Sequence, residues 1–152
     1  LILLIINTNL MNSQTKEKSA LVLIETQNEW MHPEGKLRKN LVKDDKMMLS
    51  SIANIEKALQ YARENDFSVI HVGLRFEKGY PELANGKSGL RKAIPIAGTF
   101  PIDEFGSQFY ETVKPIEKEF IATGRVGASG FAGSNLDAYL RNNKILSTAQ
   151  RE

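Results

Sequence analysis

The stretch Ala20-Leu-Val-Leu-Ile24, followed at once by Glu25, decides the fold class. An unbroken run of apolar, mostly branched residues is typical of a strand that is buried on both faces, as strands of parallel sheets are. Glu25 should therefore lie at the carboxyl end of this strand. Residues 26–40 contain Pro33 and Gly35 and predict an irregular connection.

A helix and a second strand follow this connection. Apolar residues in the range 45–65 are spaced by three and four, which predicts an amphipathic helix with a stripe made of Met48, Ile52, Ile55, Leu59 and Ala62. Residues 67–73, Phe-Ser-Val-Ile-His-Val-Gly, predict a second buried strand. A strand, a helix and a strand in this order form parallel strands joined by a right-handed crossover.

The next region predicts a long loop. Residues 77–116 hold four of the five prolines, and only residues 104–113 suggest a short helix. Long loops in compact α/β domains are usually functional or disordered. We therefore expect substrate specificity to depend on this loop.

The last part of the sequence predicts one more strand–helix–strand unit. Residues 120–123 are a third candidate strand, and Ser134 is a candidate N-cap for a helix at 135–142. Asp137 stands three residues after Ser134, as in a capping box. Residues 144–146 begin a fourth candidate strand. The sequence thus predicts an α/β fold with an open parallel sheet, formed by one domain at 20–152 after a poorly structured segment at 1–19.

Composition limits the classes of function. The 152 residues carry a net charge of +2 without a basic stripe, which argues against nucleic-acid binding. The apolar run at 1–6 is too short to span a bilayer, and we expect a cytoplasmic protein without membrane contact. The sequence has no cysteine, which excludes a disulfide, a thiolate metal site and cysteine catalysis by these residues.

The sequence shows no metal or cofactor motif. His32 and His71 have no carboxylate or second histidine at metal-ligand spacing, and His71 should be a core residue of its strand. Gly124-x-x-Gly127 and Gly130-x-x-Gly133 resemble phosphate-binding loops only weakly. We expect no metal and no cofactor.

Three charged residues stand at predicted strand ends, where ligands bind in open parallel sheets: Glu25, Arg75 and Arg125. Glu25 could act as a general base if burial raises its pKa, or it could pair with a basic group or cap a turn. Arg125 could anchor an anion or hold Glu25, but it cannot shuttle a proton. The residues alone leave these roles open.

Three motifs in order resemble the isochorismatase-like cysteine hydrolases. The first is Ala20-Leu-Val-Leu-Ile-Glu-Thr-Gln-Asn-Glu-Trp30 with His32-Pro-Glu-Gly35. The second is Val69-Ile-His-Val72 with Arg75-Phe76 and Gly79-Tyr-Pro-Glu82. The third is Gly124-Arg-Val-Gly-Ala-Ser-Gly-Phe-Ala-Gly-Ser-Asn-Leu-Asp137. The resemblance covers roughly residues 20–146 and implies a three-layer α/β sandwich of the Rossmann-like kind, assembled as a homo-oligomer.

The resemblance also implies a chemistry. Members of the family hydrolyse C–N bonds of small amides, or the vinyl ether of isochorismate, with a cysteine, an acid and a lysine. The acid falls on Glu25, where most relatives have Asp, and the lysine falls on Arg125. The substrate, an amide or a carboxylate-bearing molecule, would contact Trp30, Arg75, Tyr80 and Phe131. The cysteine would follow the fourth strand, where this sequence has only residues 147–152.

Two functional hypotheses follow from the resemblance. The sequence represents either a truncated cysteine hydrolase or a noncatalytic module that binds a small ligand or a partner at the old site. A flavodoxin-like nucleotide binder would need a phosphate loop after the first strand, and residues 25–35 do not supply one. Without the later strands of the family fold, we expect weak stability or self-association.

Overall fold

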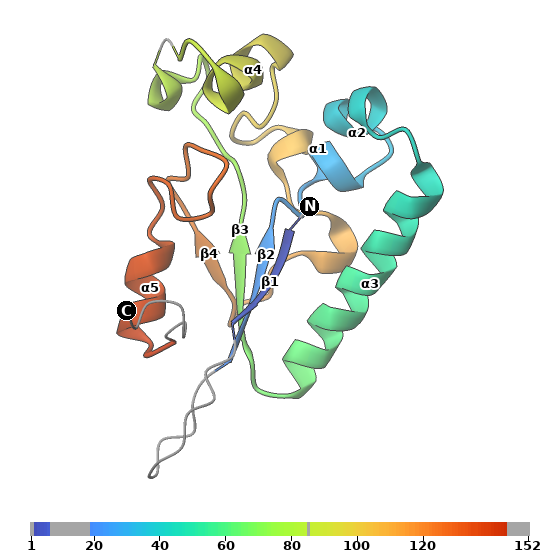
Figure 1. Cartoon of the computed structure of the whole chain (residues 1–152), viewed down its shortest axis with the longest axis vertical. Helices are drawn as coiled ribbons and strands as arrows, with labels where there is room; N and C mark the ends of the chain where they lie inside the picture. The colour runs from blue at the N-terminus through green and yellow to red at the C-terminus, as the bar shows by residue number, and fades with distance from the viewer. Residues whose placement is uncertain (1, 7–18, 85, 146–152) are drawn as a thin grey trace.

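The protein forms an open, mostly parallel sheet flanked by helices (Figure 1). Its computed structural model describes residues 2–6, 19–84 and 86–145. The strand order is β1-β2-β3-β4, and three strands run parallel: β2 (Ala20–Ile24), β3 (Ser68–Val72) and β4 (Phe120–Ala122). Three of the four predicted strands and their parallel pairing are therefore confirmed.

The strand β1 (Ile2–Ile6) was not predicted. It pairs antiparallel with β2, with Leu4 opposite Val22, and so residues 2–6 are not the poorly structured segment that the sequence suggested. The physical reason is that the outer edge of β2 offers unpaired N–H and C=O groups, which a short run of strand-forming residues can satisfy. Residues 1 and 7–18 lie outside the described part of the chain.

Helices cover both faces of the sheet, which gives three layers. Alternate residues of β2 point to opposite faces. Leu21 and Leu23 pack against α3 (Asp45–Glu64), whereas Val22 and Ile24 belong to the cluster that contains Leu136 and Leu140 of α5 (Leu136–Asn142). The predicted stripe of α3 is confirmed, because Ile52, Ile55, Leu59 and Ala62 are all buried.

Short elements gather at the carboxyl ends of the parallel strands, at the top of Figure 1. They are α1 (Asn28–Met31), α2 (Lys36–Leu41), η1 (Pro81–Leu83), α4 (Gly89–Ala97), η2 (Phe105–Ser107) and η3 (Glu111–Val113). A third apolar cluster, which includes Leu83 of η1 and Ile94 of α4, packs against Trp30 of α1 and Leu37 of α2. Val113 of η3 belongs instead to the cluster on the α3 side of the sheet. Residues of α1, α2, α4 and η1 line the cavities of the candidate site.

Two details of residues 77–116 differ from the prediction. Residues 89–97 form α4 instead of loop, because Pro95 lies near the carboxyl end of the helix and removes only one intrahelical hydrogen bond. The short helix expected at 104–113 is instead two 3₁₀ turns, η2 and η3, separated by a segment in which Phe109 forms a β-bridge with Gln27.

The last helix begins one residue later than predicted. Asn135 is the N-cap of α5, and Ser134 contributes only a hydroxyl that accepts from the Leu136 N–H at 3.2 Å. Asp137 does not close a capping box and instead pairs with Arg141 at 2.8 Å.

The fourth predicted strand, at 144–146, is not formed by Lys144 and Ile145, while Leu146 lies outside the described residues. Lys144 adopts a left-handed backbone conformation, φ 58°, which interrupts an extended chain. Ile145 still packs into the core beside α5. Within the described ranges, no helix combines the length and the apolarity needed to cross a membrane.

Candidate functional site

Glu25 lies at the carboxyl end of β2 in an unusual backbone conformation. Its φ is 60°, in the left-handed region that a residue with a Cβ rarely adopts. Its N–H donates to the carbonyl of Val72 at 2.9 Å, which fixes the conformation against the end of β3. Strain of this kind persists only where surrounding contacts hold it, and it is common at functional sites.

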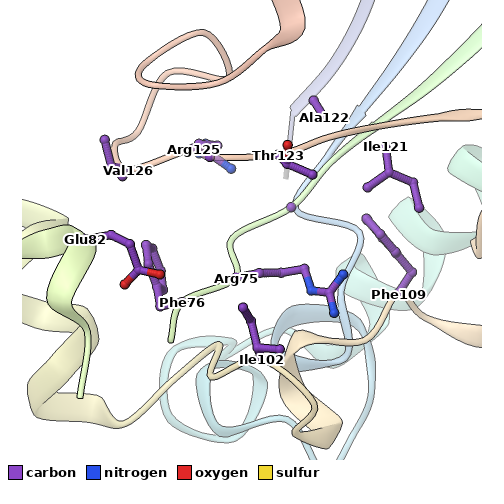
Figure 2. Close-up of a pocket in the computed structure, with 12 residues that line it drawn as sticks. Arg75, Phe76, Glu82, Ile102, Phe109, Ile121, Ala122, Thr123, Arg125 and Val126 are labelled. Atoms are coloured by element: carbon purple, nitrogen blue, oxygen red, sulfur yellow. The ribbon is translucent and has the colours of Figure 1, made fainter. Parts of the chain in front are cut away.

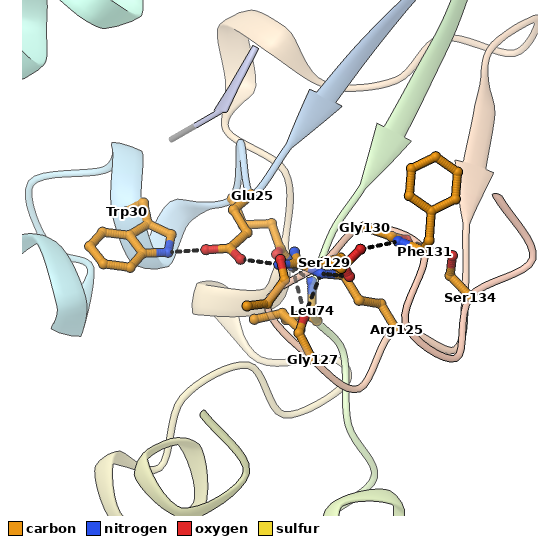
Figure 3. Close-up of polar contacts among 11 residues, drawn as sticks. Glu25, Trp30, Leu74, Arg125, Gly127, Ser129, Gly130, Phe131 and Ser134 are labelled. Carbon is orange, nitrogen blue, oxygen red and sulfur yellow. Dashed lines mark hydrogen bonds and ion pairs between the residues drawn. The ribbon is translucent and has the colours of Figure 1, made fainter. Parts of the chain in front are cut away.

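The side chain of Glu25 accepts hydrogen bonds from two sides (Figure 3). Trp30 Nε1 donates to Oε2 at 2.8 Å, and Arg125 Nη2 donates to Oε1 at 2.5 Å. The side chain of Glu25 is 18% exposed and that of Arg125 is 1% exposed. The pair is therefore largely removed from solvent, and donors on two sides fix the position of the Glu25 carboxyl group.

Arg125 is enclosed by its own loop. Its Nε donates to the carbonyls of Gly127 at 2.9 Å and Ser129 at 3.2 Å, and Nη2 also donates to that of Ala128 at 2.6 Å. Its Nη1 is buried without a hydrogen-bond partner in the described part of the chain. Of the roles that the sequence left open, the structure shows Arg125 holding both Glu25 and the loop.

Close backbone contacts shape the same loop. Gly124 has φ 84°, and a Cβ built on it would lie 2.8 Å from the carbonyl oxygen of Gly133. The N–H of Val126 donates to the carbonyl of Ala132 at 3.0 Å. The two glycines therefore allow the two sides of the loop to approach more closely than other residues could.

Gln27 is a site residue that the sequence analysis did not single out. It is fully buried, and its Nε2 donates to the carbonyls of Leu74 at 2.8 Å and Ser107 at 2.6 Å. Its Oε1 accepts from the N–H of Leu74 at 2.7 Å. Gln27 thus ties the segments after β2 and β3 to η2. The sequence feature that could have indicated this role is an amide residue soon after a buried strand, because a buried amide side chain needs hydrogen-bond partners.

A mostly apolar cavity of about 450 Å³ lies beside Glu25, and we call it the α4 cavity. Glu25 and Trp30 form one wall and α4 forms another, with Leu90, Ala93, Ile94 and Ala97 among the lining residues. Lys36 also lines it, and its ammonium donates to the carbonyl of Gly98. The acid expected from the resemblance therefore borders a ligand-sized space.

A second cavity, of about 290 Å³, lies between the ends of β3 and β4, and we call it the β3–β4 cavity (Figure 2). Its lining includes Arg75, Phe76, Ile102, Phe109 and Arg125. Arg75 is exposed and makes no ion pair or side-chain hydrogen bond with any described residue. Of the predicted site residues, only Arg75 and Arg125 line this cavity.

The structure separates the predicted substrate-binding residues. Trp30 reaches Glu25, and Arg75 lies in the β3–β4 cavity. Tyr80 packs its ring against Phe76 with 5.9 Å between the centroids, and burial raises its pKa. Phe131 is 43% exposed on the loop that follows Arg125. Tyr80 and Phe131 line neither cavity.

His71 belongs to a buried polar cluster rather than to either cavity. Its Nε2 lies 2.8 Å from Oε2 of Glu119, which also pairs with Arg63 at 2.7 Å. Burial lowers the pKa of His71 and outweighs the hydrogen bond that the imidazole makes to Glu119, which raises the pKa. No group of three or more His, Cys, Asp or Glu residues that could hold a metal is present in the described ranges.

Solved structures of similar fold include a cysteine hydrolase, an amidase and an isochorismatase family protein, in agreement with the three motifs. The cysteine hydrolase from Pseudomonas syringae has a TM-score of 0.63 at 21% identity, and the alignment covers 82% of this chain and 54% of that one. N-carbamoylsarcosine amidase from Thermoplasma acidophilum has a TM-score of 0.59 at 22% identity, with coverage of 82% and 61%. An isochorismatase family protein from Desulfovibrio vulgaris has a TM-score of 0.62 at 16% identity, and the alignment covers 82% of this chain and 60% of that one.

These likenesses establish the fold, and the chain spans only 54% to 61% of the lengths of the three structures. A comparison with curated proteins found no match. The family model of the isochorismatase domain, however, matches residues 19–148 of the sequence. The match includes β2, Glu25, Arg125 and α5, and the chain therefore belongs to the isochorismatase family.

Proposed function

We propose that these 152 residues bind a small, uncharged amide in the α4 cavity and do not themselves cleave it by cysteine catalysis. The observation that carries the proposal is the position of Glu25, whose carboxylate is fixed at the cavity wall by Trp30 and Arg125.

The carboxylate of Glu25 has room for a ligand hydrogen bond. Each carboxylate oxygen has two acceptor sites, and Trp30 and Arg125 each use one. An amide N–H of a ligand in the cavity could occupy a remaining site, while Leu74, Ala93 and Phe100 would surround its apolar part. Apolar walls with a few fixed polar groups are typical of small-molecule sites.

These 152 residues do not supply the groups that the family uses for catalysis. Cysteine hydrolysis requires a thiolate, and the sequence has no cysteine. A guanidinium does not give up its proton under ordinary conditions, so an arginine at position 125 cannot take over a lysine's proton transfer. Glu25 and Arg125 would instead hold the wall of the α4 cavity in position.

The second hypothesis is a hydrolase whose cysteine comes from a further segment or chain. The observation that favours it is that the matched structures, among them an amidase, are longer than this chain. In that arrangement Glu25 would be the acid beside the thiolate, and the ligand would be a substrate.

Calorimetric titration with benzamide tests the binding proposal. We expect saturable binding that Ala93→Phe abolishes, because residue 93 is an exposed position on the cavity wall where a larger side chain fills the space. Lys92→Phe is the matched control, since Lys92 is the preceding exposed residue of α4 and does not line the cavity. Equal binding by wild type and Ala93→Phe would refute the assignment of this cavity.

An ammonia-release assay with the same amide tests whether these 152 residues are noncatalytic. The binding proposal predicts no release by the purified 152-residue chain. Release that depends on the chain and disappears in Ala93→Phe would refute the noncatalytic proposal and would require a nucleophile other than cysteine.

A further inference from the structure

The β3–β4 cavity carries a separate inference, which does not depend on the function proposed for the α4 cavity. It lies at the carboxyl ends of two neighbouring parallel strands, where ligands commonly bind in open α/β sheets. Its volume of about 290 Å³ is at the lower end of small-molecule sites. A ligand here must be compact.

Arg75 gives this cavity its chemical character. Its guanidinium extends along the cavity toward Phe109 in Figure 2. Because it makes no ion pair with a described residue, its charge is not balanced in the way that Glu25 balances Arg125. The planar donors of arginine match the two oxygens of a carboxylate.

The other residues that line the cavity indicate which kind of anion would fit it. Phe76, Ile102, Phe109 and Val126 present an apolar surface, which suits a flat hydrocarbon group better than a strongly hydrated inorganic ion. Glu82 also lines the cavity and would repel a second negative charge. The walls therefore favour one carboxylate on an apolar body.

Arg125 also favours an anionic ligand in the β3–β4 cavity. It lines the cavity as well, and its buried Nη1 has no acceptor among the described residues. An unsatisfied buried donor is costly, and an acceptor oxygen placed nearby would reduce that cost. Arg125 is thus a second cation on the wall of this cavity, whereas the α4 cavity presents the carboxylate of Glu25.

We infer that the β3–β4 cavity is a binding site for a small aromatic or aliphatic monocarboxylate, with Arg75 as the residue that recognises the anion. The site is distinct from the α4 cavity, so the two would select molecules of opposite character: an amide donor beside Glu25 and a carboxylate beside Arg75.

Titration of the full chain with benzoate, followed by calorimetry and by amide chemical shifts, tests this inference. We expect saturable binding that shifts amides near residues 73–76 and 121–126 and weakens at higher ionic strength, since Arg75 is exposed. Arg75→Gln should weaken binding at least about tenfold, because a charge-assisted hydrogen bond is lost. Arg75→Lys should retain part of the affinity.

Arg141→Gln is the matched control, because it removes the same charge from an exposed arginine of α5 that lies in neither cavity. Benzoate binding should be unchanged in this variant. Equal affinity of Arg75→Gln and wild type would overturn the inference, as would inorganic phosphate competing as strongly as benzoate.

Ala93→Phe distinguishes this inference from the proposed function. Benzoate binding should survive that substitution, while benzamide binding is lost. If benzoate binding disappears together with benzamide binding, both ligands occupy the α4 cavity, and only the inference about Arg75 fails.

Discussion

Replacing Arg125 by lysine tests whether this residue holds the loop as well as the charge. Arg125 donates four hydrogen bonds, one to Glu25 and three to the carbonyls of residues 127–129. A lysine has one nitrogen with three protons, and from it we expect the bond to Glu25 and one carbonyl to be retained. Two hydrogen bonds of the loop would then be lost.

The magnitude follows from those two bonds. A typical intramolecular hydrogen bond contributes a net 0.5–1.5 kcal/mol, so Arg125→Lys should lower the free energy of unfolding by about 1–3 kcal/mol. For a domain of this size, a loss of about 2 kcal/mol corresponds to a decrease in Tm of roughly 4–8 °C.

Urea unfolding followed by tryptophan fluorescence is a suitable assay. The chain has a single tryptophan, Trp30, whose Nε1 donates to Glu25, so the signal comes from the site itself. Arg141→Lys serves as the control, because its pair with Asp137 is exposed and should leave the midpoint unchanged. A wild-type midpoint for Arg125→Lys would refute the view that the carbonyl contacts hold the loop.

Three further perturbations probe the surroundings of the site. Gly124→Ala should destabilise the fold more than Gly79→Ala, since both positions have positive φ but only at position 124 would a Cβ meet a backbone oxygen, that of Gly133; similar urea midpoints would contradict this close approach. Gln27→Met should cost about 3 kcal/mol or more, because three hydrogen bonds to buried backbone groups are lost at 1–3 kcal/mol each; a small change in the same assay would mean that water replaces the amide. Burial lowers the pKa of His71, so the unfolded chain binds the extra proton, and stability should fall as pH decreases below the ordinary value of 6.5, by up to about 1.4 kcal/mol per pH unit. His71→Gln should reduce this dependence, and identical pH profiles for the two proteins would show that another group causes it.

The sheet and its main helix could be predicted because their sequences encode burial directly. β2 is apolar at every position and buried at every position, and α3 shows its stripe at helical spacing. By contrast, β1 forms through pairing with an edge, which the sequence of residues 2–6 does not show by itself. The helix α4 was hidden by Pro95, whose effect depends on its position within the helix.

The site could be predicted in part for a related reason. Carboxyl ends of parallel strands share one edge, and this rule alone places Glu25 near Arg125, a pair that the structure confirms. The rule does not specify which carbonyls Arg125 contacts or that Gln27 joins three segments, because these contacts depend on loop conformation. Nor could the sequence place Trp30 and Arg75 in two different cavities.

The left-handed conformation of Glu25 has a consequence for how this pair can change during evolution. Aspartate is tolerated better than glutamate at such a φ, but its carboxylate would stand one methylene farther from Trp30 and Arg125. A shorter acid at position 25 therefore relieves the backbone and removes contacts at the same time. Selection would act on positions 25 and 125 as a unit, and the effect of changing one would depend on which side chain the other already carries.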